Sequence, residues 1–369
     1  MRKTKSLVLA VSLAGIVVLA SACGGGSGSQ GSGDGKKSGS GGGGGGKIAL
    51  LLPESKTTRY ERHDRPIFEE AVKKECSDCE ILYSNADQDA SKQQQQAEAA
   101  ITNGAEVMVL DPVDAESASV IVERAKQSDI PVLSYDRLVQ NADLDGYISF
   151  DNERVGKLQG KWLTENVDKG GNIVMINGAP TDPNAALFKK GAHSVIDGTL
   201  EVGVEYDTPD WSPDEAQREM DQAITRLGKD EIDGVYAAND GTAGGAIAAM
   251  KAAGFDKIPP LTGQDAELAA MQSLVAGDQG MTIYKAIRDE ATTAAKMAIG
   301  LLEDGEIPGD LETVGSDNGE EDVPSVLLDP VVVTTDNIKD TIIADEFWKV
   351  DEICTSKFED ACSEAGIME

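Results

Sequence analysis

The sequence is poor in aromatic residues, in histidine and in positive charge, and each shortage narrows the range of functions. Its only histidines are His63 and His193, which leave little material for a histidine metal site or a histidine base. Aspartate and glutamate number 65 against 33 lysines and arginines, a formal net charge of −32. This balance argues against binding to nucleic acid and against electrostatic adhesion to anionic lipid. Because aromatic residues make up only 4% of the chain, Tyr60 and Trp211 stand out in their polar surroundings.

A long apolar run is also lacking, because the apolar run near the N-terminus is short. Leu7 to Ala20 follows a basic N-terminus and suits the apolar region of a signal peptide better than a membrane span. It leads into small residues and Cys23, a pattern that resembles the lipobox of bacterial lipoproteins, in which the cysteine is acylated. We therefore expect a signal peptide over residues 1–23 and a lipid anchor on Cys23, at the outer face of the cell membrane. An ordinary secretory signal with an incidental cysteine is the alternative.

Four further cysteines form two close pairs, Cys76 with Cys79 and Cys354 with Cys362. Export permits disulfides, and the two local pairings need the least rearrangement of the chain among the three possible ones. A redox-active motif would usually sit at a helix N-terminus, whereas Cys76 and Cys79 lie at an expected helix-to-strand turn. A zinc site would require the two distant pairs to meet. Two structural disulfides and no bound metal are therefore expected.

From Lys47 onward the chain alternates between apolar runs and amphipathic stretches, after a Gly/Ser-rich tether at residues 24–46. The glycines before Lys47 superficially suggest a phosphate-binding loop, but Ile48 stands where serine or threonine is needed. Alternating strands and helices predict an α/β fold with parallel sheets covered on both faces. The expected strands are Ile48–Leu52, Val107–Leu110, Val132–Ser134, Tyr147–Phe150, Ile173–Ile176, Gly234–Ala237 and Met281–Tyr284. The expected helices are Pro66–Lys74, Ala90–Thr102, Ala115–Gln127, Glu153–Asn166, Pro213–Leu227, Thr242–Ala252 and Ile287–Leu302.

Polar residues repeatedly follow these strands, where open α/β sheets bind their ligands. Helix capping accounts for many of the Asp and Asn residues there, but not for Arg137 and Lys285. Carboxylates, amides, and guanidinium or ammonium groups can hydrogen-bond the hydroxyls of a monosaccharide, and flat aromatic rings can cover its C–H faces. The same positions offer no nucleophile paired with a base. The pattern therefore favours sugar binding without a catalytic residue.

The chain from Lys47 to about Ile343 resembles the D-xylose-binding proteins of bacterial importers, within the ribose/galactose-type periplasmic binding family. The matching motifs are Tyr135-Asp136-Arg137, Tyr147 to Asn152, Asn239-Asp240, Thr242 to Ile247, Gly263 to Asp265, Met281 to Lys285 and Asp322 to Ser325. By this resemblance the polar sugar ligands would be Arg59, Asp136, Arg137, Asn184, Asn239, Asp265 and Lys285, and the ring would lie between Tyr60 and Trp211. The loop around Pro183 diverges from the family. The tail after Ala344 has no counterpart, so its Trp348 is expected not to matter for binding.

The resemblance implies two Rossmann-like lobes joined by three crossovers, the type I periplasmic binding protein fold. We expect a first lobe at 47–153 plus 285–328 and a second at 154–284 plus 329–369. A monosaccharide, with D-xylose favoured over arabinose, glucose or ribose, would bind between them, and a monomeric receptor without a cofactor would deliver it to an ABC permease.

Two other classes of protein share features with this sequence. A transcription-factor effector core shares the fold but would need a helix-turn-helix and a cytoplasmic location. A sugar-processing enzyme could draw a carboxylate pair from Asp136, Asp240 and Asp265, but the cations among them indicate binding instead.

Overall fold

The computed structural model describes residues 45–368. The expected signal peptide, the expected lipidation site at Cys23 and residues 24–44 of the tether lie outside the described residues. Within residues 45–368, no helix has the length and apolar character needed to cross a membrane.

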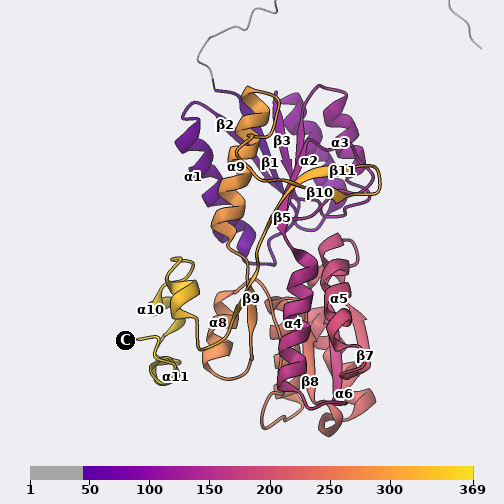
Figure 1. The fold of residues 1–369 in the computed structure, drawn as a ribbon, viewed down its shortest axis with the longest axis vertical. Coiled ribbons are helices and arrows are strands. Elements are labelled where there is room, and N and C mark those ends of the chain that lie inside the picture. Colours follow the sequence, from indigo (N-terminus) through magenta and orange to yellow (C-terminus); the bar gives the residue numbers. More distant parts are fainter. Residues whose placement is uncertain (1–44, 369) are drawn as a thin grey trace, which may run out of the picture. The chain divides into compact units, whose positions relative to one another are not determined.

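The first of two lobes is built on a seven-stranded sheet (Figure 1). All its neighbouring strands run parallel except the pair β10 and β11, which is antiparallel. In sheet order the strands are β10 (Val314–Asp317), β11 (Asp322–Leu328), β5 (Gly146–Phe150), β4 (Val132–Tyr135), β3 (Val107–Leu110), β1 (Lys47–Leu52) and β2 (Glu80–Asn85).

Helices cover both faces of this sheet, which explains its apolar strands. Ala49 and Leu51 pack towards α2 (Ala90–Thr102) and α3 (Ser119–Lys126), whereas Ile48 and Leu50 pack towards α1 (Arg65–Glu75) and α9 (Ile287–Glu303). Successive side chains of a strand point to opposite faces, so a strand buried on both must be apolar throughout.

The second lobe repeats this arrangement on a smaller sheet. The strands β7 (Glu201–Asp207), β6 (Asn172–Asn177) and β8 (Gly234–Ala237) are parallel, and backbone hydrogen bonds through residues 261–265 continue the sheet to β9 (Thr282–Tyr284) and β12 (Val331–Val333). One face is covered by α4 (Asn152–Asn166) and α5 (Pro183–Ile196), the other by α6 (Pro213–Leu227) and α7 (Asp240–Ala252).

The chain passes between the lobes three times. It crosses from β5 to α4, from β9 to α9 and from β11 to β12, and a short helix, η1 (Tyr60–Asp64), follows β1 at the end of the first lobe that faces the second. An ion pair between Arg154 and Asp329 ties two of these crossings together. Both lobes therefore contain segments that are distant in the sequence.

Several elements were not predicted from the sequence. The strands β2 and β7 lie at sheet edges and are only partly buried, so they carry no continuous apolar run. The residues after Pro183, taken as a loop, form α5, which Asp182 caps by accepting a hydrogen bond from the backbone of Asn184. Helix α8 (Leu268–Val275) is short and was also missed.

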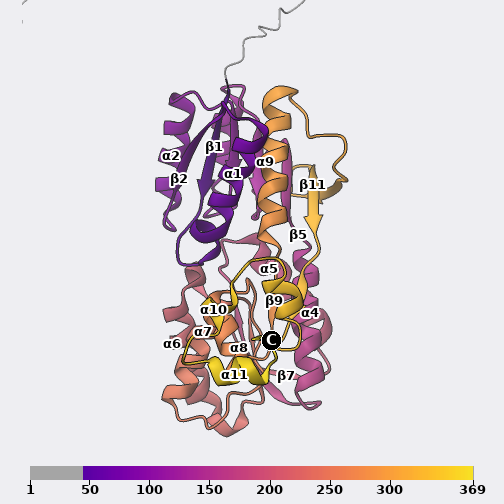
Figure 2. The same ribbon diagram turned by 90° about the vertical axis from the view of Figure 1, so that its left-hand side faces the viewer.

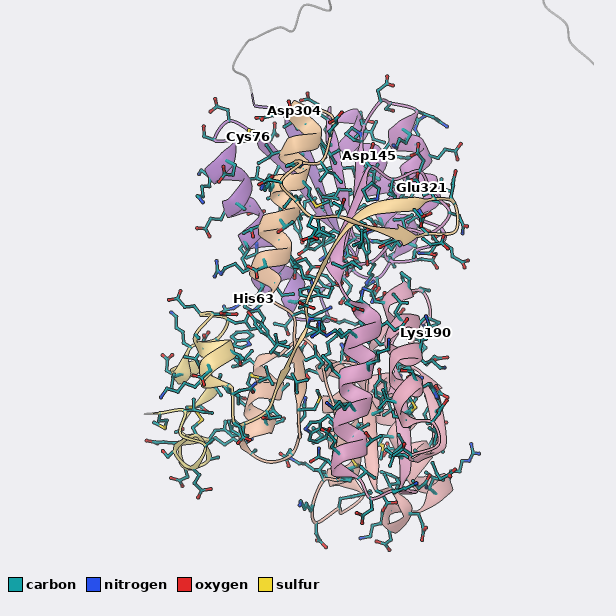
Figure 3. All side chains as sticks on the ribbon, viewed as in Figure 1. His63, Cys76, Asp145, Lys190, Asp304 and Glu321 are labelled. Carbon is teal, nitrogen blue, oxygen red and sulfur yellow. A yellow bond between two sulfur atoms is a disulfide. The ribbon has the colours of Figure 1, made fainter. Side chains whose placement is uncertain are left out.

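Both expected disulfides are present in the structure. Cys76–Cys79 lies at the turn from α1 to β2, and Figure 3 labels Cys76 at this position, far from the interlobe region. Cys354–Cys362 joins the two short C-terminal helices, α10 (Val350–Ile353) and α11 (Glu359–Glu364), which Figure 2 brings to the front. Across residues 45–368, no group of three or more His, Cys, Asp or Glu side chains is arranged to hold a metal ion.

Candidate functional site

One pocket is lined by all nine residues that the sequence predicted as ligands. Three groups of them come from the first lobe and the crossings: Arg59 and Tyr60 beyond β1, Asp136 and Arg137 beyond β4, and Lys285 beyond β9. The second lobe contributes the others from its strand ends and following helices: Asn184, Trp211, Asn239 and Asp265. These side chains are almost inaccessible to solvent, with exposures of 2–5%. Both lobes therefore contribute buried polar and aromatic side chains to the pocket.

Arg59 is held in place by three carboxylates. Its guanidinium donates to Asp64 at 2.7 and 3.0 Å, to Glu290 Oε2 at 2.6 Å and to Asp136 Oδ1 at 3.1 Å. Burial raises the pKa of Glu290 to about 8 against the attraction of Arg59, with Asp136 and Asp64 adding to the rise. Because its donors are occupied by protein carboxylates, Arg59 mainly organises the acidic groups beside it.

Among the pocket residues of the first lobe, Asp136 is held in its ionised form. Burial opposes its charge, but Arg59, Lys285 and Arg137 outweigh this and hold the pKa of Asp136 far below its ordinary value. Tyr60 adds a hydrogen bond from its hydroxyl at 3.2 Å, and Lys285 Nζ lies 3.5 Å from Asp136 Oδ1. A carboxylate in this state accepts hydrogen bonds and does not act as a proton donor.

Arg137 connects the two lobes. Its Nε lies 3.0 Å from Asp182 Oδ2 in the second lobe, and its Nη2 donates to the Tyr60 hydroxyl at 3.2 Å. On its other side, Asp111 Oδ1 is 3.7 Å from Arg137 Nε. Burial raises the pKa of Asp182 and, more strongly, that of Asp111, in both cases against the attraction of Arg137. The guanidinium is thus oriented by carboxyl groups from both lobes.

Three buried polar atoms of pocket-lining residues have no hydrogen-bond partner among the described residues. They are Gln264 Oε1, Asp265 Oδ1 and Arg137 Nε, whose 3.0 Å contact with Asp182 Oδ2 is an ion pair without hydrogen-bond geometry. Lys285 Nζ lies 3.5 Å from Asp265 Oδ1, so that contact is an ion pair at long range. Burial disfavours charge on Lys285, but Asp136 and Asp265 outweigh it and raise the pKa of the lysine. Buried polar atoms without partners cost free energy, and a ligand carrying several hydroxyl groups would satisfy them.

Trp211 forms the aromatic wall of the pocket on the side of the second lobe. Its position depends on a glycine and on a strained turn. A Cβ added to Gly178 would lie 1.9 Å from the ring of Trp211, so only glycine leaves room for the indole. Asp210 and Trp211 both have left-handed backbones, with φ of 55° and 53°, a conformation that costs free energy in residues other than glycine. Trp211 Nε1 donates to Asp182 Oδ2 at 3.0 Å, which fixes the ring.

The structure also separates capping from pocket residues. Asn239 lines the pocket and at the same time caps α7, accepting a hydrogen bond from the backbone N–H of Thr242 at 2.9 Å. Asp240, considered above for a carboxylate pair, does not line the pocket. It accepts from Gln279 and Thr282, and burial raises its pKa well above the ordinary value. Asp240 therefore has a structural role within the second lobe and is not a residue of the pocket.

Four pocket residues were missed: Thr57, Asp182, Phe188 and Gln264. Gln264 lies within a quoted motif, between Gly263 and Asp265, and could have been found there. Asp182 precedes a proline at a helix start and has the pattern of a simple cap. Nothing in the sequence marks Phe188, which lies on α5 and packs edge-on against Trp211 at 6.3 Å between ring centroids.

Comparison with known proteins places the chain among binding proteins of import systems. Residues 48–307 match the family model described as a periplasmic binding protein domain. The chain is 39% identical to the D-xylose-binding periplasmic protein of Escherichia coli over 312 residues, which cover 83% of this chain and 92% of the relative. It is 33% identical to a multiple sugar-binding periplasmic receptor of Rhizobium radiobacter, covering 72% of this chain and 81% of the relative.

A solved structure gives the same picture of the fold. The solute-binding protein of an ABC transporter from Clostridium phytofermentans, crystallised with bound β-D-glucose, superposes with a TM-score of 0.78 at 30% identity. The match covers 83% of this chain and 99% of that protein. The two-lobed α/β architecture expected from the sequence is thereby confirmed.

Proposed function

The chain belongs to the periplasmic binding protein family and is an exported binding protein, not an enzyme, and on this premise we propose that it is the receptor of an ABC importer for D-xylose. The observation that carries the proposal is the pocket itself. Both cations and carboxylates line it, and polar atoms such as Asp265 Oδ1 are buried in it without a hydrogen-bond partner. A neutral ligand with hydroxyl groups on every side supplies both donors and acceptors to such a surface.

The proposed ligands are the nine residues predicted from the sequence. Asp136 and Asp265 would accept hydrogen bonds from sugar hydroxyls, whereas Arg137, Lys285 and the amide groups of Asn184 and Asn239 would donate to them. Arg59 would hold Asp136 in its ionised state. Tyr60 and Trp211 line the same pocket and would cover the two faces of the ring. We propose Asp182 as a further member of this site, because it contacts both Arg137 and Trp211.

D-xylose is favoured over other monosaccharides by the named relative with 39% identity, whose alignment covers most of both chains. Glucose is the main alternative, because a structural relative at 30% identity was crystallised with it. Arabinose and ribose remain further candidates. The divergent segment at Asp182 and Asn184 contributes to the pocket, so the discrimination between these sugars would be decided partly there.

We further propose that binding closes two lobes, 47–153 plus 285–328 and 154–284 plus 329–369, about the three crossings. The ligand would favour the closed form only through contacts that are stronger there, such as those bridging Asp136 and Asp265. The closed monomer would then be recognised by the permease. Acylation at Cys23, with removal of the residues before it so that Cys23 becomes the mature N-terminus, would keep the receptor at the membrane.

Titration calorimetry of the detergent-solubilised mature protein with a panel of monosaccharides tests the proposal. We expect D-xylose to bind at one site per chain and more tightly than arabinose, glucose or ribose. A sugar present at 100 times its dissociation constant should also stabilise the fold by about 2.7 kcal/mol. Tighter binding of another sugar would replace xylose while keeping the receptor function, and no binding of any sugar would overturn the proposal.

A further inference from the structure

Residues 344–368, here called the C-terminal strap, form a folded part of the second lobe. Ile353, Cys362 and Ile367 are buried in one apolar cluster with Met271 of α8. The side chain of Gln272 donates to the Glu352 carbonyl at 3.1 Å, and the Cys354–Cys362 disulfide closes the strap on itself. The strap is thus packed against the second lobe.

The same strap also contacts the first lobe, through the helix η1. The His63 ring stacks on Phe347 with centroids 4.0 Å apart and meets Trp348 edge-on at 5.0 Å. Arg62 Nη2 lies 2.8 Å from Glu352 Oε1, and its guanidinium lies over the Trp348 ring at 5.3 Å. Figure 3 shows His63 where the first lobe faces the strap. These contacts join the lobes outside the sugar pocket.

Trp348 additionally holds the turn that presents Asp265 to the pocket. Its indole Nε1 donates to the Ala266 carbonyl at 2.7 Å, and the tryptophan is only 3% exposed. Asp265 and Ala266 both have left-handed backbones, with φ of 92° and 50°. Two consecutive strained residues other than glycine persist only where their surroundings over-determine them. Besides Trp348, the backbone bond from Asp265 N to the Ile283 carbonyl at 2.8 Å contributes to that restraint.

We propose that Trp348 is a positioning residue for Asp265 and that the strap couples the Asp265 turn to closure of the lobes. One indole touches both His63 of the first lobe and the carbonyl next to Asp265, so closing the lobes and fixing Asp265 would occur together. Contacts that exist only in the closed form stabilise that form and slow release of the ligand. The inference rests on the proposed sugar-binding function and revises the expectation that Trp348 does not matter for binding.

The test compares Trp348→Phe with Arg62→Ala in the detergent-solubilised mature protein. Trp348→Phe keeps an aromatic ring against His63 but leaves the buried Ala266 carbonyl without its donor, so D-xylose should dissociate about five- to tenfold faster. Arg62→Ala removes a partly exposed ion pair and should accelerate dissociation about two- to fivefold. Amide hydrogen exchange of residues 263–267, measured without sugar, should be faster in Trp348→Phe than in the wild type.

Matched controls separate this role from general loss of packing. Trp162→Phe alters an indole that packs on Gly280 within the second lobe. Lys251→Ala breaks an ion pair to Asp278 whose exposures, 53% and 28%, match the 54% and 30% of Arg62 and Glu352. Both controls should leave the dissociation rate and the exchange of residues 263–267 unchanged.

Two results would overturn the inference: unchanged dissociation and exchange in Trp348→Phe and Arg62→Ala, or equal effects in the controls. If Trp348→Phe does not fold, Arg62→Ala decides through the dissociation rate. Failure of the wild type to bind any sugar would refute the proposed function instead, and the exchange measurement would then still decide whether Trp348 restrains the Asp265 turn.

Discussion

Arg137 and Asp182 face each other from the two lobes, with Arg137 Nε 3.0 Å from Asp182 Oδ2 and both side chains more than 95% buried. Asp182 also accepts a hydrogen bond from Trp211, so one carboxyl group orients both a cation and an aromatic wall. Separating the lobes would break this pair. A ligand that bridges Arg137 and the second lobe would therefore stabilise the closed arrangement.

The first prediction concerns the two charges that would hold the sugar from opposite lobes. Arg137→Ala and Asp265→Ala should each weaken D-xylose binding about ten- to a hundredfold, because each removes a charge-assisted bond worth about 1.5–3 kcal/mol. Calorimetry on folded variants measures the change. Arg218→Ala, which removes an exposed pair to Glu215 on α6, serves as the control and should bind like the wild type. Unchanged affinity in both pocket variants would place the site elsewhere.

The second prediction uses glycine to test the aromatic wall. Gly178→Ala places a methyl group where the Trp211 ring lies, so it should displace the ring and weaken sugar binding, as Trp211→Ala should by removing it. In Gly244→Ala, the new methyl group of α7 meets no atom within 4 Å, and the helix should gain about 0.5–1 kcal/mol of stability. Equal sugar affinity in Gly178→Ala and Gly244→Ala would show that Trp211 does not contribute to the site.

The third prediction concerns the anchor. Cys23→Ser should release the protein from the membrane fraction or leave the precursor unprocessed, because no acyl chain can then be attached. Fractionation followed by mass determination of the N-terminal peptide distinguishes the two outcomes. Sugar affinity should not change, since the residues lining the pocket begin at Thr57. A mature variant retained on membranes as fully as the wild type would contradict lipidation at Cys23.

The fourth prediction concerns the pH dependence of stability at His63. Burial lowers the pKa of this imidazole from 6.5 to about 4, with Arg62, Arg59 and Arg288 adding to the effect and Asp64 opposing it. The unfolded chain then binds the proton more readily, so stability is complete above pH 6.5 and falls as the pH drops towards 4. This group contributes up to about 3 kcal/mol to that loss.

Urea unfolding at pH 7 and pH 4.5 measures this contribution. The difference in unfolding free energy between the two pH values should be smaller in His63→Gln than in the wild type, because glutamine does not titrate. His193→Gln is a control of opposite sign. Its imidazole lies on α5 beside Asp197 and Glu205, and against the opposing effect of burial the two carboxylates raise its pKa, so this variant should not reduce the pH difference. An identical pH difference in the wild type and in His63→Gln would contradict the assignment.

The pattern of residues was sufficient for the fold class but not for every element. Ile48 and Leu50 on one face and Ala49 and Leu51 on the other are all apolar because helices cover both faces of the sheet, and this pattern is visible in the sequence. The edge strand β7 was missed, because its side chains face solvent and protein in mixed order. The Cys76–Cys79 pairing could be predicted because its two residues are separated by a single turn.

The sequence by itself determined the α/β class, the local disulfides and, through its motifs, nine of the thirteen residues that line the pocket. Only the tertiary structure decided that Asp182 orients Arg137 and that Trp348 of the strap lies against the Asp265 turn. The reason is physical. Burial patterns and motifs record contacts within an element and its immediate neighbours, whereas both of these contacts join segments that are far apart along the chain. The Arg137–Asp182 contact forms between the two lobes, and the contact from Trp348 to the Ala266 carbonyl forms within the second lobe.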